Sequence, residues 1–449
     1  MSPTHFLEAP PPGVSALPGG LGWTVTDRSV AVRLLGDDRL GVVESAPVMA
    51  VLTARLPVEV RPLAAELAQF AERIMLQAAP QRHAALRKAF GRFFTADAVA
   101  ALVPTMRQIA ERIITGLAGK GGCEFMTEVA FRYAIDVGAH LLGLRPAEFS
   151  RLHKLSQRLA LVAYASRVTD PAQAVRDGHA ALVAIREAIA TARADAPDGT
   201  VLGVWNSGEI GDLADVDFEA NTVMLIQASL ETVAGMLGNA AARLLTTPGA
   251  LAGGELRDAL IDEALRAEPP LKTLERMVRE PIDLDGFRFE AGQVISVRIA
   301  DANRLDTRPE DGEIAVAGRA VLSFGWGAYR CLGARLARHQ AQELFGALHR
   351  IVPGCALADP EVERVRHIRF DMPRRLLVGW TAPAASPTDA LTEALTEALA
   401  EHDLDRPLSS VERVVAATVL QERGHQRPDL TDPPQTIREW VTWAILDHG

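Results

Sequence analysis

The sequence predicts a mainly α-helical protein with a small β portion and a helical extension at its carboxyl end. Apolar residues recur at helical spacing from Leu63 to Leu265, and few segments there alternate as strands do. A proline-containing segment near residue 383 separates a last set of amphipathic repeats from the rest. We therefore expect one large helical domain, residues 1–383, followed by a linker and a three-helix extension, residues 384–449.

Two stretches show the clearest strand pattern. The first is RSVAVRLL, from Arg28 to Leu35 near the amino terminus. The second runs from Phe287 to Arg298, where Gly286 and Gly292 are expected to form turns. Together they predict a small sheet beside the helical body.

The extension follows the sequence PAASP, from Pro383 to Pro387, which reads as a linker. The repeat ALTEALTEALAE, from Ala390 to Glu401, predicts a first helix because its leucines share one face. Ser409 or Ser410 is a candidate cap for a second helix through Leu420. A third helix is predicted by the apolar residues Ile437, Trp440, Val441, Ala444 and Ile445. The extension is expected to be either a further helical layer on the body or a module that docks a partner.

Composition and charge exclude several classes of protein. The net charge of −10 over 449 residues argues against nucleic acid as the main partner. The sequence shows no signal-peptide pattern and no run of about 18 uncharged apolar residues, so we expect a cytoplasmic protein without a membrane segment. The three cysteines, Cys123, Cys331 and Cys355, lack the spacing of a disulfide framework or a zinc site.

The most informative segment is FGWGAYRCLG, from Phe324 to Gly333. Cys331 lies between glycines, just before a predicted helix with a basic face. Backbone N–H groups in such a loop can point at the sulfur and stabilise the negative charge of a thiolate. The segment therefore predicts that Cys331 binds a metal, whereas Cys123 and Cys355 are expected to be inert buried cysteines.

A second motif lies upstream in the sequence LIDEALRAEPP. Glu263 and Arg266 stand three residues apart there, and so share one face of a helix. That spacing allows a hydrogen-bonded ion pair, although most such pairs in proteins are exposed and contribute little. The place of this pair in the chain, ahead of Cys331, favours a structural role.

Together these motifs resemble the soluble bacterial cytochrome P-450 family, over about residues 20–380. The ExxR pair of that family is Glu263 and Arg266. Its FGxGxxxCxG signature is complete in Phe324, Gly325, Gly327, Cys331 and Gly333. The segment MLIQASLETVAGM matches the family's distal helix through Ala228, Ser229, Glu231 and Thr232. The resemblance implies the cytochrome P-450 fold and a haem b whose iron is held by Cys331.

The resemblance also implies roles for other residues. The HxxxR pair, His83 and Arg87, and Arg276 before the small sheet are expected to bind the haem propionates. Glu231 and Thr232 are expected to relay protons to bound dioxygen, the alternative for Thr232 being a hydrogen bond to its own helix. Further contacts with the haem are expected from Phe324, Gly325, Tyr329, Gly333 and Ala228.

The chain departs from the family pattern at several positions. Tyr329 stands two residues before the ligand, where histidine or arginine is usual, and Val321 replaces a frequent histidine. A tyrosine there is expected to donate one neutral hydrogen bond. The stretch after Asn303 lacks the arginine that completes the ExxR network, for which Arg308 and Arg319 are candidates.

The resemblance implies a haem-thiolate monooxygenase that oxidises an apolar small molecule, free or tethered to a carrier protein, in specialised metabolism. Electrons are expected from a ferredoxin and its reductase. The ferredoxin would dock on a basic patch drawn from Arg82, Arg87, Lys88, Arg330, Arg335, Arg338 and His339, although a solvated face explains these charges equally well. Two alternatives stay open: a scaffold that binds a partner or ligand without turnover, and an oxidation driven by hydroperoxide.

Overall fold

The computed structural model describes residues 9–43, 46–162, 169–208, 213–247, 249–304, 321–359, 361–381, 387–399 and 403–446, with gaps at 410–411, 414–415, 418 and 421–433. The chain divides into two compact units. The large unit comprises Met1–Leu117 and Gly122–Trp380, and the small unit comprises Ala118–Gly121 and Thr381–Gly449. The two units are described separately below.

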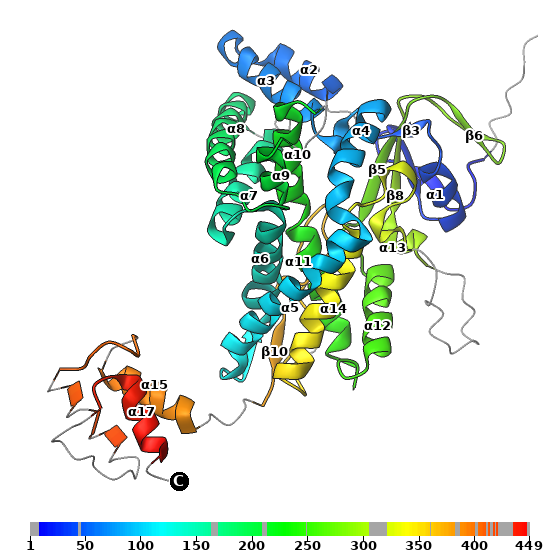
Figure 1. The fold of residues 1–449 in the computed structure, drawn as a ribbon. Coiled ribbons are helices and arrows are strands. Elements are labelled where there is room, and N and C mark those ends of the chain that lie inside the picture. Colours follow the sequence, from blue (N-terminus) through cyan, green and yellow to red (C-terminus); the bar gives the residue numbers. More distant parts are fainter. Residues whose placement is uncertain are drawn as a thin grey trace, which may run out of the picture. The chain divides into compact units, whose positions relative to one another are not determined.

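Helices form most of the large unit, which confirms the predicted helical body (Figure 1). None of the helices in the described ranges combines the length and apolar character that a membrane crossing needs. In chain order the helices are α1 (Arg28–Leu35), α2 (Ala46–Arg55), α3 (Arg61–Glu72), α4 (Pro80–Gly91), α5 (Ala96–Ala118), α6 (Phe131–Leu142), α7 (Pro146–Leu161), α8 (Pro171–Ala194), α9 (Val201–Asn206), α10 (Asp215–Ala228), α11 (Glu231–Leu244), α12 (Gly254–Ala267), α13 (Ile299–Ala302) and α14 (Ala334–Ile351).

The prediction of a strand at Arg28–Leu35 is wrong, because this segment is helix α1. Asp27 caps the helix, and its side chain accepts a hydrogen bond of 2.9 Å from the backbone N–H of Val30. The buried residues recur at helical rather than alternating positions: Val30, Ala31, Leu34 and Leu35. The cap and the helical spacing of the apolar face therefore outweigh the short alternation.

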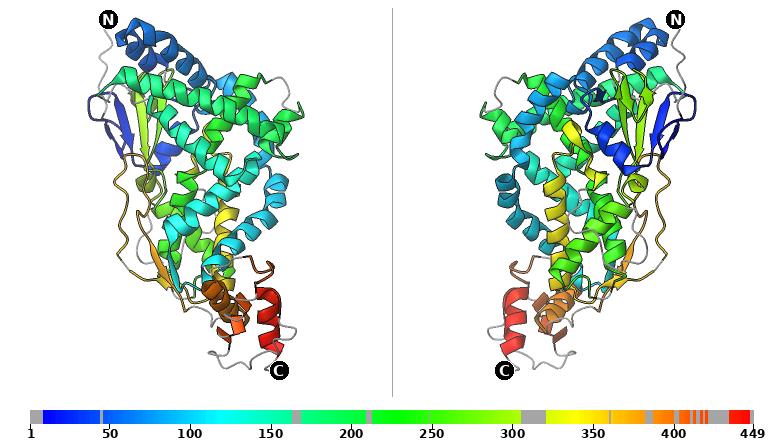
Figure 2. Two further views of the ribbon diagram at one scale, coloured as in Figure 1. Left: turned by 90° about the vertical axis from the view of Figure 1, so that its left-hand side faces the viewer. Right: turned by 90° about the vertical axis from the view of Figure 1, so that its right-hand side faces the viewer.

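In the described residues of the large unit, strands form three small sheets. The five-stranded sheet has the order β1-β2-β8-β5-β3, and the three-stranded sheet has the order β4-β10-β9. Figure 2 shows the five-stranded sheet at one side of the helices. The strands are β1 (Val14–Ala16), β2 (Gly22–Val25), β3 (Leu40–Gly41), β4 (Gly122–Glu124), β5 (Thr273–Val278), β6 (Ile282–Leu284), β7 (Phe287–Phe289), β8 (Val294–Arg298), β9 (Ala356–Leu357) and β10 (Leu377–Gly379).

The predicted strands between Phe287 and Arg298 are confirmed as β7 and β8. Gly286 and Gly292 have φ angles of 81° and 86°, a left-handed conformation that glycine adopts without strain. β6 and β7 pair with each other, while β8 pairs with β2 and β5. Gly286 therefore lies in the turn of the β6–β7 hairpin, and Gly292 lies in the turn that connects this hairpin to β8 of the larger sheet.

Helices α10 and α11 lie in sequence but are separated at Ser229 and Leu230. The hydrogen bonding of α10 ends with the N–H of Ser229, which donates to the carbonyl of Leu225 over 3.1 Å. Helix α11 then packs against α6, α12 and α14. The break places Glu231 and Thr232 in the first turn of a new helix.

The small unit has its own helices and its own core. Helix α15 (Pro387–Leu399) and helix α17 (Ile437–Leu446) confirm the first and third predicted helices of the extension. Between them, Ser409 and Glu412 exchange hydrogen bonds as a capping box, and the described residues up to Leu420 are helical. The core is formed by Leu395, Leu408, Ala416, Ala417, Leu420, Ile437, Trp440 and Val441. The predicted linker, up to Ser386, lies outside the described residues.

Candidate functional site

Cys331 lies in a loop between a short turn at Gly327–Tyr329 and helix α14. Its backbone N–H donates to the carbonyl oxygen of Phe324 over 2.7 Å, which closes the loop. Gly327 has a φ angle of 67°, and a Cβ there would lie 2.3 Å from the carbonyl oxygen of Leu35. Any larger residue would displace the loop. The glycines of the motif thus fix the position of the cysteine.

Several effects act in opposite directions on the thiol of Cys331. Desolvation by the surrounding protein is the largest and raises its pKa, although Cys331 itself is an exposed residue. The backbone N–H groups of Gly333 and Ala334 and the charges of Arg87 and Arg330 act in the other direction. These N–H groups open helix α14, and they are the donors that stabilise a thiolate bound to a metal.

Three of the predicted site residues meet around the ring of Tyr329. His83 of α4 is buried, with its ring 4.3 Å from that of Tyr329. The guanidinium of Arg276, on β5, lies 5.1 Å from the centre of the same ring. Burial lowers the pKa of both His83 and Arg276, and nearby positive charges lower that of His83 further. The ring of Tyr329 therefore lies between His83 and Arg276 in this cluster.

Arg87 interacts electrostatically with both His83 of this cluster and Cys331. Burial lowers its pKa, while Cys331 acts to raise it. In the described part of the chain, no carboxylate forms an ion pair with His83, Arg87 or Arg276. The two arginines are partly buried, and a partly buried cation without an anionic partner is unfavourable, which two propionates would balance. An accessible thiol beside such cations therefore fits a haem.

A second group of predicted residues lies where α11 begins. The Glu231 carboxylate faces α7, with one oxygen 3.0 Å from Nε2 of His153 and the other accepting a hydrogen bond of 2.8 Å from Gln157. Burial would raise the pKa of Glu231, but the hydrogen bonds from His153, the backbone and Gln157 together hold it below its usual value. Sequence reasoning missed His153 and Gln157, because no local pattern marks a contact across more than 70 residues.

Thr232 forms the hydrogen bond of the alternative interpretation. Its Oγ1 donates to the carbonyl oxygen of Ala228 over 2.5 Å, across the break between α10 and α11. Ala228 is exposed and Thr232 is half-buried. The lone pairs of the hydroxyl still allow Thr232 to accept a further hydrogen bond.

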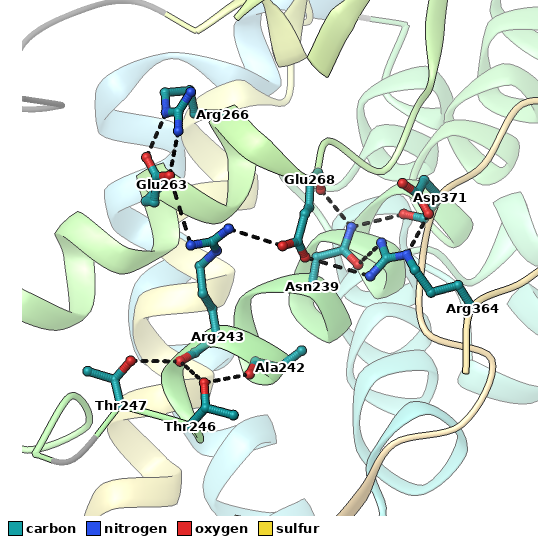
Figure 3. Close-up of polar contacts among 10 residues, drawn as sticks. All are labelled: Asn239, Ala242, Arg243, Thr246, Thr247, Glu263, Arg266, Glu268, Arg364 and Asp371. Atoms are coloured by element: carbon teal, nitrogen blue, oxygen red, sulfur yellow. Dashed lines mark hydrogen bonds and ion pairs between the residues drawn. The ribbon is translucent and has the colours of Figure 1, made fainter. Parts of the chain in front are cut away.

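The predicted ion pair between Glu263 and Arg266 is present (Figure 3). Arg266 donates from Nε and Nη2 to the two carboxylate oxygens over 2.7 and 2.6 Å. Arg308 and Arg319, the predicted third members of the network, lie outside the described residues. A cation from another helix, Arg243, lies 3.9 Å from Glu263 instead.

The cations of the predicted basic patch fall into two sets. Arg82 pairs with Asp217, and Arg338 donates to Asp262 over 2.9 Å. By contrast, three cations are exposed and form no ion pair with any residue that the structure describes: Lys88, Arg330 and Arg335. The patch available to a partner is therefore smaller than the sequence suggested.

Comparisons with known proteins agree with these motifs. The family model for cytochrome P-450 matches residues 255–365. The chain is similar to vitamin D(3) 25-hydroxylase of Pseudonocardia autotrophica, with 31% identity over 294 residues, which cover 64% of this chain and 72% of the relative. This similarity extends well beyond the segment around the cysteine.

Two solved structures show the same fold. The structure of the enzyme CxnD, described as forming a C–S bond in chuangxinmycin biosynthesis, has a TM-score of 0.64 and 25% identity and covers 83% of this chain and 91% of its own. P450BioI, solved with an acyl carrier protein bearing hexadec-9Z-enoic acid, has a TM-score of 0.68 and 23% identity and covers 80% and 92%. The predicted fold is confirmed, and the chain belongs to the cytochrome P-450 family of haem-dependent monooxygenases.

Proposed function

We propose that this protein uses haem b to insert one oxygen atom of dioxygen into an apolar small molecule, in the biosynthesis of a specialised metabolite. The observation that carries the proposal is the exposed cysteine Cys331 near two partly buried arginines, Arg87 and Arg276, which form no ion pair with any carboxylate among the described residues. The likeness to CxnD supports the metabolic setting. A substrate tethered to a carrier protein stays a prediction.

Different residues of the site are proposed to bind different parts of the haem. When bound, the haem supplies a thiolate-ligated iron that activates dioxygen. Cys331 is the proposed axial ligand, and His83, Arg87 and Arg276 are the proposed partners of the propionates. The proposed contacts with the macrocycle come from Phe324, Gly325, Tyr329, Gly333 and Ala228.

Glu231 and Thr232 are the proposed proton carriers. His153 and Gln157 orient the Glu231 carboxylate and keep it ionised, so it accepts a proton from solvent only transiently. Thr232, next in the chain, is proposed to turn its hydroxyl away from Ala228 and to take part in the same relay. This rotation connects the observed hydrogen bond with the proposed relay.

Turnover under isotope-labelled dioxygen tests the proposed reaction. The protein is supplied with a ferredoxin, its reductase and a set of apolar candidate substrates selected by spectral binding. We expect a product that carries one labelled oxygen atom. Binding without any product would favour the non-catalytic scaffold. Product formed only with added hydroperoxide, and without label from dioxygen, would favour the peroxide-driven alternative.

The proposed electron donor is an acidic ferredoxin that docks beside Cys331. Lys88, Arg330 and Arg335 are the cations available to it, because they are exposed and unpaired in the described part of the chain. Opposite charges on two surfaces raise the association rate of the two proteins. Salt weakens this attraction, because at about 0.1 M it screens charges that lie more than about 10 Å apart.

Reversing two of these charges, in Lys88→Glu with Arg335→Glu, is expected to slow reduction of the haem by the ferredoxin. We expect the defect to be largest at low ionic strength and to shrink as salt is added, in stopped-flow reduction traces. Arg151→Glu with Lys154→Glu is the matched control, since it reverses two charges on α7 that are also exposed and form no ion pair with any described residue. Equal slowing in the control would contradict docking at this patch.

We propose that residues 1–383 are the haem domain and that residues 384–449 form an extension that folds around its own core. Trp440 is fully buried among residues of the extension. Trp440→Ala is expected to destabilise the extension by about 3–5 kcal/mol, because it leaves a large cavity.

Deleting residues 384–449 is expected to leave the haem content and the carbon monoxide spectrum unchanged. Calorimetry of the full chain should resolve a separate transition for the extension, and Trp440→Ala should shift that transition alone. Loss of haem on deletion would contradict the proposed boundary, because the extension would then be part of the haem domain.

A further inference from the structure

We propose that Arg243, on α11, is the third member of the Glu263–Arg266 network and positions the loop of Cys331 through it. The inference rests on the proposed ligation of haem by Cys331. It replaces the expectation that an arginine after Asn303 fills this place.

Arg243 bridges the two carboxylates at the end of α12 (Figure 3). Its Nη1 lies 3.9 Å from Oε1 of Glu263, the oxygen that also accepts from Nη2 of Arg266 over 2.6 Å. Its Nη2 donates to Oε1 of Glu268 over 3.0 Å. Glu268 is the first residue after α12, so one guanidinium joins the last turn of that helix to the chain that follows.

The charges of the network balance only when Arg243 is counted. Glu268 also lies 3.6 Å from Arg364, which donates from Nε to Asp371 over 2.7 Å. The carboxylates of the network are then Glu263, Glu268 and Asp371, and its cations are Arg243, Arg266 and Arg364. The Glu263 side chain is only 17% exposed, so solvent would compensate poorly for a missing cation.

Helix α11 is held against the same segment by two further residues on the same face. Asn239, one turn before Arg243, donates to the backbone oxygens of Glu268 and Asp371 over 2.7 and 2.9 Å. Its side-chain oxygen accepts from Arg364 over 2.9 Å. A Cβ on Gly235, another turn earlier, would lie 3.0 Å from the side chain of Pro270. Arg243 therefore belongs to a face of α11 that packs closely against the segment after α12.

A continuous path leads from Glu263 to the cysteine loop. Arg266 donates from Nη1 to the backbone oxygen of Asn303 over 3.3 Å. The side chain of Asn303 then binds the N–H of Leu322 over 2.8 Å and the hydroxyl of Ser323 over 3.0 Å. Ser323 precedes Phe324, whose carbonyl oxygen accepts from the N–H of Cys331. A change at Arg243 thus reaches the proposed iron ligand through hydrogen bonds and adjacent residues.

The Nε of Arg243 is buried and has no hydrogen-bond partner among the described residues. A buried N–H donor without a partner lowers the stability of the fold. A methionine at this position would fill similar space and would carry no such donor. The compensating benefit that the geometry offers is the contact with Glu263 and Glu268. Arg243 acts here as a positioning residue, since it reaches the iron ligand only through others.

The test compares variants of the full-length holoenzyme. Arg243→Met removes the charge and keeps most of the volume, while Arg243→Lys keeps the charge and loses the planar fork. The matched control is Arg107→Met, which breaks another ion pair between helices, Arg107 with Glu343 at 2.8 Å. The readouts are haem per chain, the rate of haem transfer to apomyoglobin, and the Soret band of the ferrous carbon monoxide form.

We expect Arg243→Met to lose haem and to convert the thiolate band to the form seen with a neutral ligand. Arg243→Lys should show a smaller change of the same kind, and Arg107→Met should match the wild type. A wild-type spectrum and transfer rate in Arg243→Met would overturn the inference. If that variant does not fold, a wild-type transfer rate in Arg243→Lys would overturn it instead.

Two further variants decide which arginine completes the network. Arg308→Met and Arg319→Met are expected to keep the thiolate band. Loss of that band in either of them, with Arg243→Met unchanged, would return the role to the segment after Asn303. Absence of the band in the wild type would overturn the proposed function itself, which separates that failure from a failure of Arg243 alone.

Discussion

Replacing Cys331 with serine will abolish the red-shifted Soret band of the reduced protein under carbon monoxide. A serine hydroxyl stays protonated at neutral pH and supplies no thiolate to the iron. The backbone N–H groups of Gly333 and Ala334 would still point at the side chain, but no charged sulfur would be there to receive them. We expect this variant to lose most of its haem and all of its turnover, measured by the pyridine haemochrome and the carbon monoxide difference spectrum.

Cys355→Ser is the matched control for this substitution. Burial raises the pKa of Cys355 to about 11, so its thiol stays protonated. Its variant should keep the wild-type band. A thiolate band that survives in Cys331→Ser, or that disappears in Cys355→Ser, would show that the iron ligand has been assigned to the wrong cysteine.

Replacing Glu231 with glutamine will uncouple the consumption of electrons supplied by the ferredoxin from product formation. Loss of a positioned proton donor costs about 10²–10⁴-fold in rate, so we expect product formation to fall by that order. Thr232→Val should have a similar effect, because it removes the hydroxyl beside Glu231. Glu219→Gln is the control, since Glu219 is also a carboxylate held by a neighbouring helix, with 2.9 Å to Arg186. An equal loss in Glu219→Gln would contradict a specific role.

The pH dependence of turnover follows from the same carboxylate. His153 and Gln157 contribute to a pKa of Glu231 below its usual 4.5, so the ionised form persists to lower pH than usual. The stability that this ionised group contributes is present above pH 4.5 and is lost as pH falls through its lowered pKa. In His153→Gln the pKa should rise, and the acid limb of the rate profile should move to higher pH. An unchanged acid limb would contradict the proposed link between His153 and Glu231.

The parts of the fold and site that the sequence predicts correctly depend on local patterns. The helical body follows from apolar periodicity over many turns, and the turn at Gly292 follows from a residue type that tolerates a positive φ angle. The pairing of Glu263 with Arg266 depends on a spacing of three within one helix. Each of these features is determined by residues that are close in the chain.

One local signal and several features that depend on tertiary contacts were missed. Helix α1 was predicted as a strand because eight residues of alternation carry little information, and its cap at Asp27 was overlooked. His153 meets Glu231 only because α7 packs beside the start of α11. Arg243 sits in an apolar helical sequence that gives no sign of a network partner, and the packing of His83 against the ring of Tyr329 was not anticipated.

The most direct test of the account is the absorbance spectrum of the purified wild-type protein, reduced and exposed to carbon monoxide. We predict about one haem per chain and a strongly red-shifted Soret band, as expected when the Cys331 thiolate binds the iron. A protein that folds but takes up no haem, or that shows only the band of a neutral ligand, would contradict the account.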